Sequence, residues 1–328
     1  MRIGFAGLIH GHVWGLIDRF EEVSEVQLSA VADATPLLER AKGRFAAAFT
    51  DWREMLDKEE LDALVVTSDN RESAEIAVQA LGQGIPCLVE KAMAADAADA
   101  ARMLDATERS GMTLMVNWPI AWQGWPHELA RRLADPALGP VFHFRFRTGH
   151  WGPKEIGCDE HFVGWLYDER RNGGGAIADF CGYGAVLAAW YFGLPESVYA
   201  ARGNYTKAPG EVPDDHAILV LKYPKMSAVL EGTWATFGFD ESANPVAHAK
   251  GGTLGVYENV VKLFTPGKEP EAFDSPSPEV QSPAAYFLDG IRNGKEPEGI
   301  LSPVVSAHAA RIVDAGVRSS ASGREEKP

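Results

Sequence analysis

A lysine directly follows an apolar run in the segment "LVEKAMA", residues 88–94, so Lys91 stands where a buried strand would end. In open α/β sheets, ligands bind at the carboxyl ends of the strands, and an ammonium group there lowers the pKa of a neighbouring hydroxyl. The apolar approach "PCLV" favours a buried position. The alternative is a solvated strand-end lysine that simply pairs with Glu90.

The turn "GLIHGH", residues 7–12, follows the first strand-like segment and can serve a nucleotide. Glycines in such a turn let backbone N–H groups approach a diphosphate. Gly7 and Gly11 are present, but Ile9 replaces the second fingerprint glycine and His12 stands near the third. The turn alone is a weak signal, and it makes Gly7, Ile9, His10, Gly11 and His12 candidate cofactor contacts.

Asp33 strengthens the nucleotide interpretation, because it ends the second strand-like segment about 20 residues after the turn, where a ribose-binding acid is expected. A carboxylate there repels a 2′-phosphate, and neither Ala34 nor Thr35 is basic, so we predict NAD rather than NADP as the cofactor. The alternative is that Asp33 only caps the next turn. Further candidate cofactor contacts stand at or after the ends of later strands: Thr67, Ser68, Asn70, Glu90 and Lys91.

His10 and His12 lie close enough in sequence to suggest a metal site. No acid or cysteine follows them at a ligand spacing, and a turn that faces phosphates is a suitable place for a polar ring. The three cysteines, Cys87, Cys158 and Cys181, are scattered, with no spacing typical of zinc or a disulfide framework. We therefore expect no metal.

Length and charge limit the classes of function. At 328 residues, two domains are expected. The net charge of -15 argues against binding to nucleic acid or an anionic membrane and favours a small-molecule partner. The opening "MRIGFAG" enters a strand pattern at once, and no apolar run approaches the roughly 20 residues needed to span a bilayer. We expect a cytoplasmic protein.

The chain has two regions with different hydrophobic patterns. Up to about residue 119, short apolar runs alternate with amphipathic stretches, which predicts βαβ units and a parallel, doubly wound Rossmann-type sheet. From residue 120 to residue 328, period-2 segments joined by Gly, Pro and Asp turns predict an α+β domain with a large, mostly antiparallel open sheet. We assign residues 1–119 to dinucleotide binding and residues 120–328 to substrate binding and oligomerisation.

The chain resembles the Gfo/Idh/MocA oxidoreductases over nearly its whole length. The resemblance rests on "IGFAGL", "VAD", the "EKP"-like element with Ala92 in place of proline, "GGGAIADFCGYGA", "DDHAILVLKYP" and "ARIVDAGVRSSASG". It implies a nicotinamide cofactor, a sugar, inositol or polyol substrate, and a homodimer or homotetramer.

The resemblance also implies a catalytic pair. Many members have histidine four residues after the aspartate of the glycine-rich element, whereas here Tyr183 follows Asp179. A tyrosine at this position resembles the branch of the family that contains glucose–fructose oxidoreductase and dimeric dihydrodiol dehydrogenase. In that branch the tyrosine is thought to be the acid/base. A phenol has a reference pKa near 10, which a nearby lysine such as Lys91 lowers. By periodicity alone, Tyr183 would pack on its helix against apolar neighbours.

Polyols are held by hydrogen-bonding groups and aromatic faces. Asp179 is either a helix N-cap or a substrate contact. The tryptophans are more often core residues, and His161 is either a substrate contact or an exposed loop residue. The further candidate substrate contacts are Asn117, Trp118, His150, Trp151 and His161.

The sequence predicts an NAD-dependent oxidoreductase that acts on a hydroxyl or carbonyl of a sugar, inositol or related polyol. One alternative is a glycosidase that oxidises its sugar transiently and shows no net NADH. Another is a non-catalytic sensor of nucleotide or sugar, which the altered glycine turn keeps open.

Overall fold

The computed structural model describes residues 1–239 and 242–328, which form two compact units. Unit 1 comprises residues 1–118, 158–173 and 280–307, and unit 2 comprises the remainder. The expected division placed everything from residue 120 onward in the second domain, whereas two later segments belong to unit 1. The local sequence pattern does not reveal that a later segment belongs to the first unit, because contacts between distant segments decide which unit it joins.

Unit 1 contains a six-stranded, entirely parallel sheet with strand order β3-β2-β1-β4-β5-β6. This confirms the doubly wound sheet predicted from the alternation. Every residue of β4, β5 and β6 is buried, as expected for strands covered on both faces. The strands are β1 (Arg2–Ala6), β2 (Gln27–Ala32), β3 (Ala47–Phe49), β4 (Ala63–Val66), β5 (Cys87–Glu90) and β6 (Leu114–Asn117).

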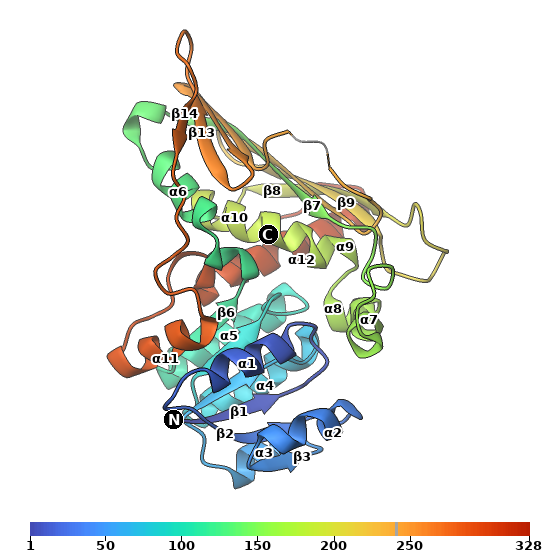
Figure 1. Ribbon diagram of the computed structural model, residues 1–328. Coiled ribbons are helices and arrows are strands. Elements are labelled where there is room, and N and C mark those ends of the chain that lie inside the picture. The colour runs from blue at the N-terminus through green and yellow to red at the C-terminus, as the bar shows by residue number, and fades with distance from the viewer. Residues whose placement is uncertain (240–241) are drawn as a thin grey trace. The chain divides into compact units, whose positions relative to one another are not determined.

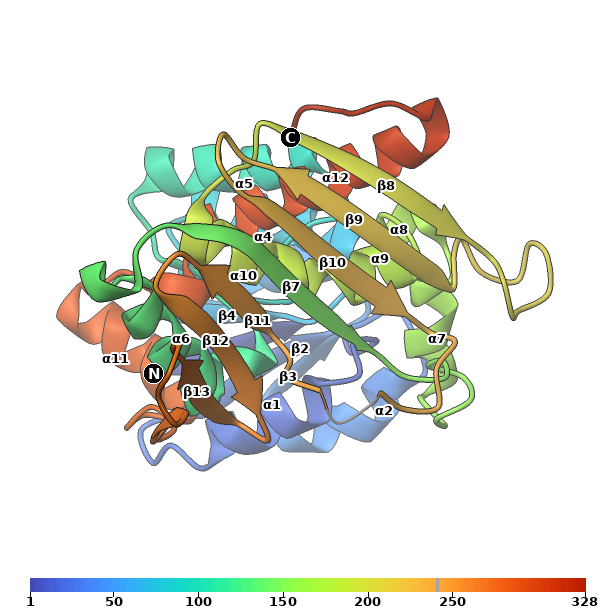
Figure 2. The ribbon, with the colours of Figure 1, turned by 90° about the horizontal axis from the view of Figure 1, so that it is seen from above.

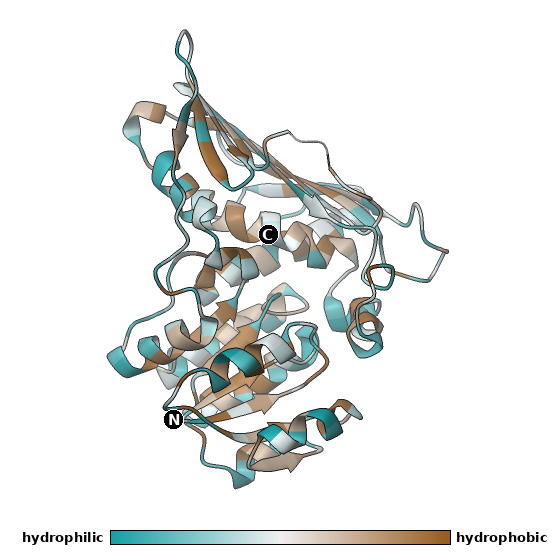
Figure 3. Ribbon diagram, viewed as in Figure 1, coloured by the Kyte–Doolittle hydropathy of each residue, from teal (hydrophilic) through white to brown (hydrophobic). Residues whose placement is uncertain are grey.

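Three of the helices between these strands begin after an aspartate whose side chain caps them. Asp69 accepts a hydrogen bond from the Glu72 N–H and Asp96 accepts one from the Asp99 N–H, which satisfies donors that the first helical turn leaves unpaired. Figure 3 shows hydrophobic residues along the central strands and hydrophilic residues on the surrounding helices. The helices are α1 (Val13–Glu21), α2 (Leu37–Ala41), α3 (Trp52–Lys58), α4 (Asn70–Gly82), α5 (Ala97–Ser110), α7 (Glu160–Leu166), α8 (Glu169–Asn172) and α11 (Pro283–Asn293) (Figure 1).

Unit 2 contains an eight-stranded sheet with order β14-β13-β12-β11-β7-β10-β9-β8. All its pairs are antiparallel except β7 with β10, which confirms the mostly antiparallel sheet predicted from the period-2 segments. The strands are β7 (Val141–Gly149), β8 (Ser197–Gly203), β9 (His216–Lys222), β10 (Ser227–Thr233), β11 (Val246–Ala249), β12 (Gly252–Tyr257), β13 (Val260–Phe264) and β14 (Glu271–Phe273).

One face of this sheet is covered by helices of the same unit. Figure 2 looks onto the other face, with α9 (Ala176–Asp179) and α10 (Cys181–Phe192) behind the strands. Helix α10 is apolar around most of its circumference, with eight of its residues buried, so it belongs to the core of unit 2. The remaining long helices are α6 (Gly124–Leu133) and α12 (Pro303–Ser322). Within the described ranges, no helix has both the length and the hydropathy needed to cross a bilayer.

Candidate functional site

The first turn of unit 1 has a geometry that requires glycine at its start. Gly7 has φ 84°, and a Cβ atom on it would lie 2.6 Å from the backbone nitrogen of Ser68. Its N–H donates to the Ala32 carbonyl at 2.8 Å, and its carbonyl accepts from Thr67 Oγ1 at 2.5 Å. The turn therefore lies against the carboxyl ends of both β2 and β4, where a dinucleotide fold binds its diphosphate.

The other turn residues face α7, a contact that the sequence did not suggest. The Ile9 carbonyl accepts a hydrogen bond from Trp165 Nε1 at 3.3 Å, and Ile9 is 7% exposed. A Cβ atom on Gly11 would come within 3.2 Å of the Phe162 ring. Positions 9 and 11 thus also serve to pack the turn against α7, whose residues belong to a segment more than 150 residues later in the chain.

Asp33 joins the end of β2 to the first turn. Its Oδ2 accepts from the Leu8 N–H at 2.6 Å, while its Oδ1 accepts from the Thr35 N–H at 2.6 Å and from the Thr35 hydroxyl. Asp33 is only 7% exposed. The carboxylate both caps its local turn and lies beside the backbone that would cradle the diphosphate, so the two roles weighed from the sequence are compatible.

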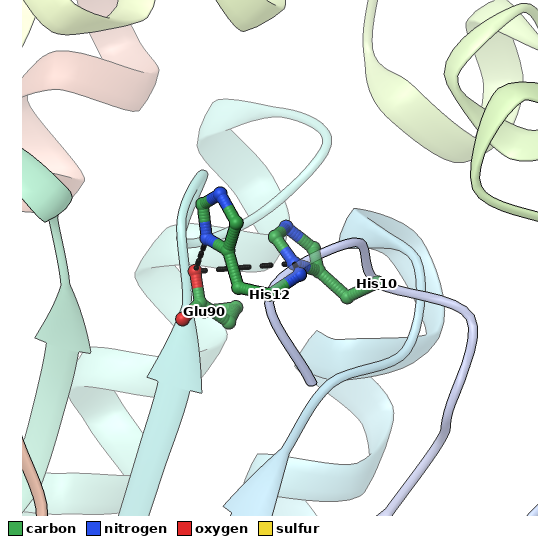
Figure 4. A group of neighbouring side chains, drawn as sticks. All are labelled: His10, His12 and Glu90. Atoms are coloured by element: carbon green, nitrogen blue, oxygen red, sulfur yellow. Dashed lines mark hydrogen bonds and ion pairs between the residues drawn. The ribbon is translucent and has the colours of Figure 1, made fainter. Parts of the chain in front are cut away.

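His10, His12 and Glu90 meet at the end of β5 (Figure 4). His12 Nδ1 lies 2.9 Å from Glu90 Oε2, and His10 Nδ1 lies 4.0 Å from the same oxygen. His10 Nε2 lies 3.1 Å from the Lys91 carbonyl, which can only accept, so Nε2 carries the proton. His10 Nδ1 in turn accepts from the His12 N–H at 3.2 Å. Both ring nitrogens of His10 are therefore engaged.

Burial controls the charges in this cluster. It is the main reason that the pKa of His10 falls to about 3, with the charges of His12 and Lys91 acting in the same direction, so His10 is neutral at physiological pH. Burial raises the pKa of Glu90, but the charge of His12 and hydrogen bonds from His12 and Asn117 outweigh it and hold that pKa well below its ordinary value. Glu90 is therefore a buried carboxylate in its ionised form.

Lys91 is buried at the carboxyl end of β5, as the sequence predicted, and is 8% exposed. The peptide bond between Lys91 and Ala92 is cis. Asn117 ends the neighbouring strand β6 and donates from Nδ2 to Glu90 Oε1 at 2.6 Å. The structure therefore brings Lys91, Glu90 and Asn117 to one edge of the sheet, together with the two histidines of the first turn.

Three other candidates of unit 1 have contacts within that unit. Ser68 donates its hydroxyl to Glu72. Asn70 Nδ2 donates to Asn172 Oδ1 at 2.9 Å, which connects α4 to α8. Trp118 is 1% exposed and donates from Nε1 to Ser306 Oγ at 3.0 Å. The burial of Trp118 corresponds to the core role that the sequence left open for the tryptophans.

The remaining unit 1 candidate, His161, is the second residue of α7 and does not lie in a loop. Its backbone N–H donates to Asp159 Oδ1 at 2.9 Å, and its side chain is half-buried. Asp159 is thus the N-cap of α7, and His161 extends from the first turn of a helix that packs against the Gly7–His12 turn through Phe162 and Trp165.

Asp179 and Tyr183 lie in unit 2, on α9 and α10. Asp179 is not the N-cap of either helix, so that interpretation is wrong: Gly175 caps α9 and Phe180 caps α10. The Asp179 carboxylate instead accepts from Trp234 Nε1 at 3.0 Å. Tyr183 is half-buried, and its ring stacks on Phe180 with 6.3 Å between ring centroids.

His150 and Trp151 follow β7 in unit 2. His150 Nδ1 accepts from the Gly152 N–H at 2.9 Å, and its ring meets that of Phe180 edge-on with a centroid distance of 4.9 Å. Trp151 is 45% exposed and lies beside Phe237, at a centroid distance of 5.5 Å. His150 and Tyr183 are therefore both neighbours of Phe180, and Trp151 presents an aromatic face.

Comparisons with known proteins agree with this architecture. Residues 3–118 match the oxidoreductase family with an NAD-binding Rossmann fold, and residues 127–251 match the GFO/IDH/MocA C-terminal domain. Scyllo-inositol 2-dehydrogenase (NADP(+)) IolU of Bacillus subtilis is 28% identical over 68% of this chain and 67% of its own length. D-apiose dehydrogenase of Paraburkholderia graminis is 33% identical over 42% of this chain, and the match spans only 36% of that relative.

A solved structure has the same fold. Levoglucosan dehydrogenase in complex with NADH and levoglucosan gives a TM-score of 0.80 at 18% identity, with 100% of this chain and 99% of that chain covered. The two family matches lie on the two parts that the sequence and the structure distinguish, the parallel sheet and the mostly antiparallel one. The chain therefore belongs to the GFO/IDH/MocA oxidoreductase family, with its NAD-binding Rossmann fold followed by its C-terminal domain.

Proposed function

We propose that the protein is an NAD-dependent oxidoreductase that moves a hydride between the nicotinamide and a hydroxyl or carbonyl group of a sugar, inositol or related polyol. The observation that carries this proposal is the buried Lys91 at the carboxyl end of β5, in a parallel sheet of the dinucleotide-binding type. The names of the apiose and inositol dehydrogenase relatives support the substrate class.

The residues around the first turn fit a dinucleotide. At Gly7 a Cβ atom would clash with the Ser68 backbone, so only a glycine fits at this position of the turn. The Asp33 carboxylate, beside Leu8, suits ribose hydroxyls and repels a 2′-phosphate. We therefore propose NAD over NADP, although the IolU relative is named for NADP. No metal is part of the proposal.

The bound nicotinamide supplies the hydride acceptor or donor, and the protein must move the hydroxyl proton. We assign this proton to Tyr183, on α10, as general acid/base. Lys91 holds the substrate oxygen and lowers the pKa of the phenol by its positive charge. Five further candidates are proposed to contact the substrate hydroxyls and C–H faces: Asp179, Asn117, His150, Trp151 and His161. The burial of Trp118 supports a core role for it instead.

The open face of the unit 2 sheet supports a homodimer or homotetramer. Tyr199, Val220, Val229 and Arg145 lie opposite one another across four adjacent strands. Tyr199 is 46% exposed and Val220 is 38% exposed. An apolar sheet face of this kind is normally covered, and a second copy of the chain is the proposed cover. We place the protein in the cytoplasm.

The first experiment measures dinucleotide binding. The purified protein is checked by absorbance for retained cofactor, and NAD and NADP are then titrated calorimetrically. Aldoses, inositols and other polyols are next screened for NADH formation. Tighter NAD binding with NADH formed from one of these classes supports the proposal. Sugar release from a glycoside without net NADH indicates the glycosidase, and binding of neither dinucleotide overturns the proposal.

A further inference from the structure

His12 occupies the position of the third glycine in the dinucleotide fingerprint, which here reads Gly7, Ile9, His12. It is the N-cap residue of α1, yet its side chain does not cap the helix. The ring instead lies against Glu90 at the end of β5, with Nδ1 2.9 Å from Oε2 (Figure 4). The sequence departs from the fingerprint at a position where the structure has a specific contact.

This contact bridges the switch point of the sheet. His12 follows β1 and Glu90 ends β5, and β4 lies between those two strands. The chain order reverses between β1 and β4, and the crevice at such a reversal is where a dinucleotide crosses the sheet. The His12–Glu90 pair therefore lies at the place where the diphosphate passes, next to the N-terminus of α1.

An ionised carboxylate at this place needs an explanation. Glu90 is 3% exposed, and a negative charge beside a diphosphate site opposes binding unless a cation compensates it. Asn117 satisfies Oε1 with a neutral amide, at 2.6 Å. His10 is neutral, because both of its nitrogens are engaged and it is buried. His12 is in direct contact with Oε2 at 2.9 Å, and the positively charged Lys91 directly follows Glu90 in the chain.

His12 also has a second nitrogen to offer. Its Nδ1 faces Glu90, and within the described ranges no hydrogen bond engages its Nε2. The side chain is 39% exposed, whereas that of His10 is 1% exposed. In Figure 4 the far side of the His12 ring points away from Glu90 and from His10. The His12 ring thus presents Nε2 outward while its Nδ1 is held at the carboxylate.

We propose that Glu90 fixes the His12 ring through Nδ1, so that Nε2 of His12 binds the diphosphate of the bound dinucleotide. The pair supplies, through one side chain, binding that a glycine-rich turn supplies through its backbone. Glu90 acts through His12 and is a positioning residue. This inference rests on the proposed function, because it requires that a dinucleotide binds.

The test uses three nucleotides that differ in what they present. AMP lacks the diphosphate, ADP-ribose contains it, and NAD adds the nicotinamide. Each is titrated calorimetrically into the wild-type protein and into His12→Asn, Glu90→Gln and the double variant. Loss of one charge-assisted hydrogen bond should weaken ADP-ribose and NAD binding by about 10- to 100-fold, and leave AMP binding within about twofold. His127→Asn, in unit 2, is the matched control.

The double variant separates a coupled pair from two independent residues. If Glu90 acts through His12, adding Glu90→Gln to His12→Asn should weaken ADP-ribose binding no further. Additive losses, an equal loss for AMP, or unchanged ADP-ribose binding in His12→Asn would each overturn the inference. Melting curves of all variants verify that they are folded.

Three further outcomes also decide the matter. One equivalent of zinc retained by the dialysed wild-type protein and lost in His12→Asn would overturn the inference in favour of a metal centre at His10, His12 and Glu90. Wild-type protein that binds neither ADP-ribose nor NAD would overturn the proposed function and this inference together. Wild-type protein that binds NAD as tightly as His12→Asn does would overturn the inference alone.

Discussion

The amide of Asn117 donates from Nδ2 to Oε1 of Glu90 at 2.6 Å, which joins the ends of β6 and β5 by a buried hydrogen bond. The two residues are also paired directly in the parallel register of the strands. Glu90 is 3% exposed and Asn117 is 5% exposed, so water cannot easily replace the bond if it is lost. The carboxylate of Glu90 therefore depends on Asn117 for one of its two oxygens.

Replacing Asn117 with leucine should lower the free energy of unfolding of unit 1 by about 1.5–3 kcal/mol, the usual contribution of a hydrogen bond to a charged group. Asn117→Asp should cost more, because it sets a second carboxylate against the first. Urea denaturation at neutral pH measures both changes. The control is Asn293→Leu at an exposed position of α11, expected within about 0.5 kcal/mol of wild type. An Asn117→Leu protein as stable as wild type would contradict the prediction.

His10 should make unit 1 sensitive to mild acid. Its pKa is about 3 in the folded protein, against an ordinary value of 6.5, mainly because of burial. As the pH falls below 6.5 the unfolded chain takes up a proton and the folded protein does not. The stabilisation present above pH 6.5 is therefore lost progressively toward pH 3, by about 2 kcal/mol between pH 7 and pH 5.

The variant His10→Gln retains a donor for the Lys91 carbonyl and removes the titrating group. Urea midpoints measured from pH 7 to pH 5 should therefore fall less steeply for this variant than for wild type. His216→Gln on β9 serves as the control and should keep the wild-type slope. Equal slopes for wild type and His10→Gln would mean that other groups account for the acid sensitivity.

Asp33 should set the preference between NAD and NADP. Asp33→Asn preserves an acceptor for the Leu8 N–H and removes the charge that would repel a 2′-phosphate. We expect the ratio of the Kd for NADP to the Kd for NAD to fall about tenfold, a change of about 1.4 kcal/mol. Calorimetric titration of both dinucleotides measures the ratio, and Asp51→Asn, at the N-cap of α3, is the control. If Asp33 only caps its turn, both affinities will change together and the ratio will stay constant.

The open face of the unit 2 sheet should be an interface between copies of the chain. Tyr199→Glu combined with Val220→Lys places charges on adjacent strands of that face, where burial against a partner would be costly. Light scattering at micromolar concentration should show a wild-type dimer or tetramer and a variant of lower mass. Val260→Lys, an exposed residue on β13, is the control. A monomeric wild type would contradict the proposed assembly.

Local patterns were sufficient for the parallel sheet, the antiparallel sheet and the strand-end position of Lys91, because each depends on a short run of residues. The strand β3 and the helix α3 were missed, since a strand of three residues and a helix of seven residues show too little periodicity to be recognised. The expected cap at Asp179 was wrong for a different reason. Asp214, from the strand region after residue 210, accepts from the Gly175 and Ile177 N–H groups at 2.9 and 2.8 Å and takes that role.

The candidate site shows the same limit more clearly. No acid follows His10 and His12 at a ligand spacing in the sequence, and yet Glu90 reaches His12 from 78 residues away. Such a contact depends on which strands are neighbours in the sheet, and the order β1-β4-β5 is a property of the whole fold. Residue types at a strand end can therefore be predicted from the sequence, but their partners cannot.

Lys91 and Tyr183 should act on the same chemical step. Tyr183→Phe removes the proposed acid/base and should lower kcat by about 10²- to 10⁴-fold, with NAD affinity within a few-fold of wild type. Lys91→Met should lower kcat similarly, and Lys91→Arg should restore only part of it, because a guanidinium differs from an ammonium in shape and donor geometry.

The pH profile distinguishes a shared step from two separate effects. If the charge of Lys91 lowers the pKa of the Tyr183 phenol, the rising limb of kcat/KM should move to higher pH in Lys91→Met, toward the ordinary phenol value near 10. Tyr191→Phe is the matched control and should keep the wild-type profile, because Tyr191 is a half-buried tyrosine of the same helix whose hydroxyl donates to the Pro126 carbonyl. Full turnover in both Tyr183→Phe and Lys91→Met would exclude this pair and transfer the search for the acid/base to the remaining titratable side chains of the site.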